Sequence, residues 1–171
     1  MARSDSFFIR AELALDNLGT FTTSAIDLGS FVDALGKTVL RIHNVSTQYT
    51  YGTNSAPLIA NPNDEGITSW QLTTQSQTGM VNASNRTVIS TGALVAANGS
   101  GVGNTVTFVS SDIDVAPQHW QNGFLLAVES IQLAGKSGSQ FADACDVSIV
   151  LECTVETMTA AASMALALSQ Q

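Results

Sequence analysis

Ionised side chains are scarce in this sequence. Its 171 residues include 6 Lys or Arg and 14 Asp or Glu, so charged residues make up 12% of the chain. Soluble monomers usually carry more charge. Thr, Ser, Asn, Gln, Gly and Ala take the places that charged residues usually occupy. We interpret this as an outer surface packed against neighbouring subunits, where burying charge is costly. A secreted, Thr/Ser-rich β-domain is the alternative interpretation.

Basic residues are the scarcer of the two charged kinds. The formal net charge is −8, the isoelectric point is about 4.3, and Arg3 and Arg10 are the only bases before Lys37. A chain of this charge repels phosphate backbones and has no basic arm that could neutralise a packaged genome. Direct nucleic-acid binding is therefore not expected.

Cysteine occurs only as Cys145 and Cys153, which both fall in the last predicted strand. In an extended strand they lie roughly 26 Å apart at about 3.3 Å per residue, which no disulfide spans. We therefore expect free thiols, with Cys153 as a small core residue. The N-terminus, Met-Ala-Arg-Ser-Asp, has no apolar signal region, and no run approaches 18 apolar residues. We expect synthesis in the host cytoplasm, no export and no membrane span.

Residue spacings typical of catalytic, metal or phosphate sites are also missing. The histidines, His43 and His119, lie in different segments, and no CxxC, HxxxH, HExxH or GxSxG spacing occurs. Asp112 and Asp114, at a strand end, could hold a calcium ion, but such pairs are more often solvated charges that protect a strand edge. The glycine-rich stretch 98–103 precedes a strand, whereas a phosphate cradle needs a helix. We expect no catalytic residue, cofactor or metal ligand, and no enzymatic activity.

What the chain does contain is a series of segments in which apolar and polar residues alternate. Such a period of two is that of a half-buried strand, and it is clearest near the two ends of the chain, at 7–15 and 147–155. Gly, Asn and Pro separate the segments, as expected for turns. Many short strands with regular turns indicate an antiparallel sandwich or barrel. The predicted strands are 6–15, 20–28, 38–51, 67–77, 86–96, 104–115, 123–133 and 145–157.

Two segments depart from this pattern. Residues 30–35 have apolar residues at helical spacing between two glycines, which predicts one helical turn with Ser30 as its N-cap. No charged side chain occurs from Thr157 to Gln171, and the run Met158–Leu168 is rich in helix formers. A helix this short is not stable alone in water, so the C-terminal tail, 158–171, needs a surface to lie on.

Together these features resemble the single-jelly-roll capsid proteins of icosahedral viruses, especially those that infect bacteria and archaea. The most similar stretches are Val39–Val45 and Ile67–Gln75, which look like two neighbouring sandwich strands joined by a loop with Pro57 and Pro62. The resemblance implies an all-β, eight-stranded antiparallel jelly roll over 1–157, in two four-stranded sheets. It also implies a self-assembling major capsid subunit of the virion, whose partners are copies of itself; whether a second capsid protein takes part stays open.

The tail is the expected site of a further contact. Many capsid families hold their genome with a basic arm, and this chain has none. The uncharged residues 158–171 would instead contact an internal membrane or a neighbouring subunit. We favour the neighbouring subunit, because several alanines give a smooth surface that packs against protein. Lipid-facing helices usually carry larger apolar side chains and flanking Lys or Trp.

Two other functions fit the same composition. A carbohydrate-binding or adhesin-like β-sandwich would use Trp70, Tyr49, Tyr51 or Trp120 as stacking platforms, although a Trp70 buried in the sheet is the simpler expectation. A fibre or filament subunit would donate the strand Phe7–Leu15 to its neighbour. Closed particles, glycan-binding monomers and filaments distinguish the three functions.

Overall fold

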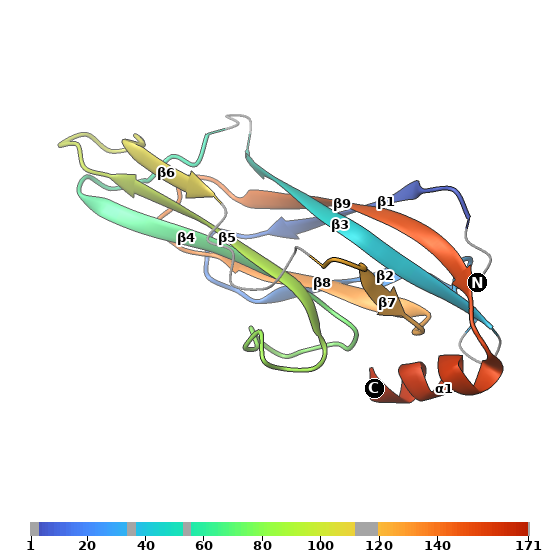
Figure 1. Cartoon of the computed structure of the whole chain (residues 1–171). Helices are drawn as coiled ribbons and strands as arrows, with labels where there is room; N and C mark the ends of the chain where they lie inside the picture. The colour runs from blue at the N-terminus through green and yellow to red at the C-terminus, as the bar shows by residue number, and fades with distance from the viewer. Residues whose placement is uncertain (1–3, 34–36, 53–55, 112–119, 171) are drawn as a thin grey trace.

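The computed structural model describes residues 4–33, 37–52, 56–111 and 120–170, and within these ranges the chain forms nine strands and one helix. The strands make two antiparallel sheets packed face to face (Figure 1). Sheet A has the order β1-β9-β3-β7, and sheet B has the order β2-β8-β4-β5-β6. The elements are β1 (Phe7–Leu15), β2 (Thr22–Asp27), β3 (Thr38–Tyr51), β4 (Asp64–Thr73), β5 (Val88–Asn98), β6 (Phe108–Ser111), β7 (Phe124–Leu126), β8 (Ser130–Ser137), β9 (Cys145–Thr157) and α1 (Ala160–Ser169).

A nested pairing of strands explains this order. With β6 set aside, the first strand pairs with the last, β1 with β9, and the following pairs are β2 with β8, β3 with β7, and β4 with β5. This is one long antiparallel hairpin, and rolling it up adds the contacts of β3 with β9 and of β4 with β8. A rolled hairpin of this kind is a jelly roll. The expected all-β antiparallel jelly-roll sandwich is confirmed, and β6 extends the edge of sheet B.

The segment predicted as one strand at 123–133 is two strands, β7 and β8. β7 pairs with β3 in sheet A, whereas β8 pairs with β2 and β4 in sheet B, so the chain crosses between the sheets at 127–129. Ala127, within the crossing, is fully buried against Val39 and Ala167. No Gly, Asn or Pro separates the two strands, and Phe124–Val128 form one apolar run, so the sequence shows no turn signal at the crossing.

The helical turn expected at 30–35 begins earlier. The Val32 N–H donates to the Leu28 carbonyl at 3.0 Å, the spacing of a helical bond. The Asp27 carboxylate accepts a backbone N–H of the same turn at 2.8 Å, so Asp27 has the capping role that was expected of Ser30. The last residues of the expected turn lie outside the described ranges, as do residues 112–115 of the strand predicted at 104–115.

The core lies between the two sheets. From sheet B, the buried Trp70 donates its Nε1–H to the Tyr49 hydroxyl at 2.9 Å. The Tyr51 hydroxyl lies 2.8 Å from Thr68 Oγ1, which lies 2.8 Å from Ser137 Oγ, so these buried polar groups satisfy one another. Sheet A contributes the inward-facing row of β9, of which every side chain is at most 1% exposed: Cys145, Val147, Ile149, Leu151 and Cys153.

Residues 74–87, between β4 and β5, fold back over the outer face of sheet B. The side chain of Gln71 faces away from the core, donates to the Gly79 carbonyl at 3.1 Å and accepts from the Val81 N–H at 2.9 Å. Gln71 is therefore fully buried beneath this segment. β4 ends at Thr73, where the covering segment 74–87 begins, and not at the predicted boundary at 77.

The packing of Gly92 against Trp70 gives a test of the core. A Cβ at Gly92 would lie 2.6 Å from Trp70 Nε1, whereas a Cβ at Gly101 would meet open space. We expect Gly92→Ala to lower the free energy of unfolding by about 1–3 kcal/mol through overpacking. The matched variant Gly101→Ala should leave the free energy of unfolding nearly unchanged. Urea denaturation measures both, and equal effects of the two substitutions would contradict the packing described for Trp70.

Candidate interaction surfaces

The residues considered for metal binding or catalysis are few. In the part of the chain that the structure describes, no group of three or more His, Cys, Asp or Glu side chains is placed to hold a metal ion. His43 lies where the β3–β9 register shifts, between Ile42 and Asn44, and its Nε2 is 2.9 Å from Thr154 Oγ1. It is therefore a hydrogen-bonded sheet residue, as expected. His119 and the pair at 112 and 114 lie outside the described ranges.

The two cysteines are buried free thiols, as the sequence predicts. Both thiols face the core from β9. Burial is the main cause that raises the pKa of Cys145 to about 11 and the pKa of Cys153 to about 12. Because the thiolate is the reactive form, neither thiol is a nucleophile or a ready cross-linking group in the folded chain.

The four aromatic residues considered for sugar stacking differ in exposure. Trp70 and Tyr51 are each 1% exposed, and Trp120 is half-buried against Phe124, with ring centroids 5.7 Å apart. Burial raises the pKa of Tyr51, and its hydroxyl is bonded inside the core. Tyr49 accepts the hydrogen bond from Trp70. Trp70 and Tyr51, two of the four residues considered for sugar stacking, are thus core residues.

The C-terminal tail forms the expected helix, α1, which lies at one end of the sandwich (Figure 1). Thr159 Oγ1 caps it by accepting from the Ala162 N–H at 3.3 Å. Ser163, Ala167 and Gln170 face the sandwich and are buried. The surface on which the tail lies therefore belongs to its own chain, where Val39 and Ala127 pack against Ala167.

The opposite side of α1 is exposed and mainly apolar. Met164 is 48% exposed and Leu168 is 65% exposed, and the alanines beside them are exposed as well. Their spacing places them on one helix face. We call this face the α1 stripe; it consists of Ala161, Met164, Ala165 and Leu168.

Gln170 fastens the end of α1 to the sandwich. Its Oε1 accepts from the Ala127 N–H at 3.0 Å, and its Nε2 donates to the Leu125 carbonyl at 2.6 Å. Its backbone carbonyl accepts from Thr74 Oγ1 at 2.8 Å. These three bonds tie the helix to β7, to the crossing after it and to the chain beyond β4. The α1 stripe is therefore held in a fixed orientation.

An ion pair joins β3 to the end of β9 that leads into α1. The Arg41 guanidinium in β3 donates to both carboxylate oxygens of Glu156 in β9, at 2.7 and 2.8 Å, and also to the Asn122 carbonyl. Glu156 is 5% exposed, and its hydrogen bond raises the pKa of Arg41. The pair sits next to Thr157, where β9 ends, and the Met158 N–H that follows donates to the Lys37 carbonyl at 2.7 Å.

A second apolar surface lies on the outer face of sheet B. Ile67 in β4 is opposite Val95 in β5, and Ala97 in β5 is opposite Phe108 in β6, so these four side chains share one face. Ile67 is 46% exposed and Phe108 is 57% exposed. We call these residues the β6-end patch. β6 and α1 lie at opposite ends of the sandwich (Figure 1).

The outer face of sheet A is mainly polar, although Phe8 in β1 is exposed on it. Across β1, β9 and β3, the register places polar residues in each outward row, for example Glu12, Ser148 and Gln48. Four charged side chains of this face are exposed or half-buried, namely Arg10, Glu12, Asp146 and Glu152, whereas Glu156 of the Arg41 ion pair is buried. This face therefore contrasts with the β6-end patch of sheet B.

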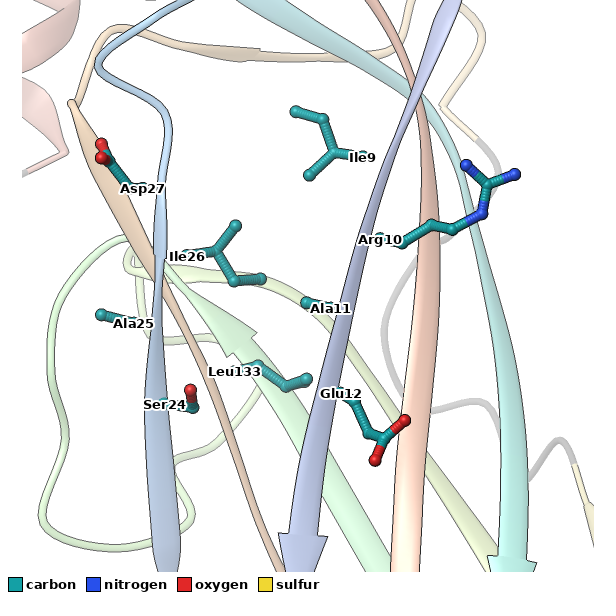
Figure 2. A pocket seen from close by; sticks show the side chains of 9 residues that line it. All are labelled: Ile9, Arg10, Ala11, Glu12, Ser24, Ala25, Ile26, Asp27 and Leu133. Atoms are coloured by element: carbon teal, nitrogen blue, oxygen red, sulfur yellow. The ribbon is translucent and has the colours of Figure 1, made fainter.

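The open side of the sandwich lies between β1 and β2, which are the edge strands of the two sheets. Between them is a groove of about 390 Å³ lined by residues 9–12, residues 24–27 and Leu133 (Figure 2). Figure 2 shows Ile9 and Ala11 on the groove side of β1, and Arg10 and Glu12 on the other side.

Within the described ranges, the structure contains no helix that is long and apolar enough to cross a membrane. α1, at ten residues, is the tail helix already described.

Comparison with known proteins finds similarity in structure but not in sequence. No family of known sequences and no curated protein matches the chain. A structure from Desmodium yellow mottle tymovirus is 9% identical, with a TM-score of 0.34, and the match covers 90% of this chain and 87% of the viral chain. Turnip yellow mosaic virus gives 8% identity, a TM-score of 0.32 and coverages of 90% and 82%. A structure of maize chlorotic mottle virus is 8% identical, with a TM-score of 0.35, and the match covers 91% of this chain and 96% of the viral chain.

The bonds of Gln170 give a test of how α1 is held. In Gln170→Ala the buried Ala127 N–H loses its acceptor, so we expect a loss of about 1–3 kcal/mol in the free energy of unfolding. The tail should also become sensitive to limited proteolysis. The matched control is Ser169→Ala, which removes only an exposed bond within the helix, from Ser169 Oγ to the Leu166 carbonyl. If both variants behaved alike in urea denaturation and proteolysis, the hydrogen bonds of Gln170 would not be what holds α1 on the sandwich.

Proposed function

We propose that this chain is a self-assembling structural subunit of an icosahedral virion shell. The observation that carries the proposal is the position of its exposed apolar surfaces. The α1 stripe and the β6-end patch lie at opposite ends of a jelly-roll sandwich (Figure 1), in a chain with few charged residues. Exposed apolar patches on a rigid surface are typical of protein–protein contacts.

Two different patches at opposite ends suit a head-to-tail contact. If the α1 stripe of one copy packs on the β6-end patch of the next, the contact is heterologous, and repeating it around an axis closes a ring. Affinity then comes from many modest interfaces that act together. The scarcity of ionised side chains lowers the cost of removing water from such contacts.

The partners in this proposal are copies of the same chain, and the location is the virion. We assign the α1 stripe to a neighbouring subunit rather than to lipid, because half of it is alanine and the tail has no flanking Lys or Trp. The net charge of −8 disfavours direct contact with nucleic acid. The bacterial or archaeal type of shell rests on the sequence resemblance alone.

Electron microscopy of patch variants tests the proposal. The wild-type protein should form closed particles in negative stain. Leu168→Glu and Phe108→Glu each place a charge in one patch at an exposed position, so both should fold but fail to assemble. The control is Leu18→Glu, since Leu18 is 75% exposed and belongs to neither patch. Filaments or dispersed monomers of the wild type, or particles of all three variants, would contradict the proposal.

Assembly should also depend on ionic strength. Each copy carries a net charge of −8, so the subunits repel one another, and this repulsion is screened over about 10 Å at 0.1 M salt but about 30 Å at 0.01 M. We expect light scattering to show stronger assembly as NaCl is raised through this range, or when calcium is added. Equal assembly in salt-free buffer with a chelator would contradict this expectation.

A further inference from the structure

β1 is an open edge of unusual regularity. It is nine residues long and pairs with β9 from end to end without a bulge. Its other edge has no strand partner in the described part of the chain. Long, straight edges are usually protected by bulges, prolines or like charges, because their free N–H and C=O groups invite another strand. β1 has no proline, and its two charged residues, Arg10 and Glu12, have opposite signs.

The groove beside β1 gives an incoming strand a surface to cover. Ile9 and Ala11 point toward Ile26 and Leu133 across this opening, whereas Arg10 and Glu12 point away from it (Figure 2). Ile9 and Ala11 are half-buried, whereas Ile26 and Leu133 are buried beneath them. A strand laid against the edge of β1 would continue sheet A and close this side of the sandwich.

We propose that β1 pairs antiparallel with β1 of a second copy, about a two-fold axis at Ala11. The inference rests on the self-association proposed above and names one contact by which it occurs. Sheet A would then run continuously through both copies. In this register Arg10 lies opposite Glu12 of the second copy, and Glu12 lies opposite its Arg10.

The side chains match at the other positions as well. On the outer face, Phe8 lies opposite Ala14 of the second copy. On the inner face, Ile9 lies opposite Leu13, and Ala11 lies opposite Ala11. Charged residues therefore meet opposite charges, and apolar residues meet apolar residues, along the strand.

Neighbouring registers are worse for a physical reason. A shift of two residues in one direction places Arg10 opposite Arg10, and a shift in the other direction places Glu12 opposite Glu12, so like charges would meet. A shift of one residue turns the groove side of one strand to the outer face of the other. The charge pattern of β1 thus selects one register and rejects its neighbours.

This contact differs from those of the two patches. It is isologous and formed by backbone hydrogen bonds along a sheet edge, whereas the α1 stripe and the β6-end patch would form a heterologous contact. A shell needs contacts about several axes. β1 would supply the two-fold contact, and the patches would supply the contact around rings.

Charge reversal tests the register. The dimer is measured by sedimentation at low salt in the Leu168→Glu/Phe108→Glu background, which disables the two patches. Arg10→Glu or Glu12→Arg alone creates two like-charge pairs, and we expect the dissociation constant to rise about tenfold or more. The double variant Arg10→Glu/Glu12→Arg restores opposite charges and should return to within about threefold of the unswapped background. Lys136→Glu and Glu129→Arg make the same charge changes at exposed sites away from β1 and should have little effect.

Disulfide trapping tests the axis. In Ala11→Cys the two new thiols would face one another across a strand pair, at about 4.5–5.5 Å between Cα atoms, within disulfide range. Oxidised glutathione would accept the two electrons and two protons that the thiols lose, and a covalent dimer should appear on a non-reducing gel. Ala14→Cys, on the same strand, would lie about 20 Å from its counterpart and should not cross-link. The natural cysteines are buried and do not interfere.

The outcomes separate this inference from the proposed function. A dimer that responds to the swaps and cross-links through position 11 supports the β1 contact, whether or not the wild type forms particles. Particles of the wild type without that cross-link, and with equal effects of single and double swaps, overturn the β1 contact and leave the shell function standing. Monomers under all conditions overturn both.

Discussion

The pairing of β9 with both β1 and β3 is the constraint on which the rest of the structure depends. It joins the start of the chain to its end, and its inward row fills the centre of sheet A. The pairs β2 with β8, β3 with β7, and β4 with β5 are nested inside it, which gives the jelly roll. The same pairing leaves β1 at the edge of the sheet and brings α1, which follows β9, to the end of the sandwich.

The sequence predicts the strands whose two faces differ in environment. β3 and β9 have the predicted bounds, 38–51 and 145–157, because one side of each strand is buried and the other is hydrated, so the alternation is strong. Around Ala127 the same signal fails, because no Gly, Asn or Pro marks the point where the chain crosses between the sheets. The sheet to which a segment belongs depends on which distant strand supplies its hydrogen bonds. The alternation of apolar and polar residues along the sequence does not indicate that partner.

The candidate surfaces were predictable to a smaller extent. The uncharged tail indicated a helix that must pack on something, but the amide of Gln170 carries no signal that it would bond to Ala127 and Leu125. The β6-end patch combines residues from three strands, so it exists only after the register is set. The sequence shows the opposite charges of Arg10 and Glu12. It does not show that these residues lie on an edge strand.

The position of the remaining charges suggests how a chain with so few of them could assemble specifically. Apolar ends supply affinity but little discrimination between registers, because one apolar contact resembles another. Charged side chains on an edge strand discriminate strongly, since a shift of two residues turns attraction into repulsion. A subunit with apolar ends and a few opposed charges on β1 therefore needs little charge overall. In the proposed assembly, the scarcity of ionised residues would follow from this division of roles between the surfaces.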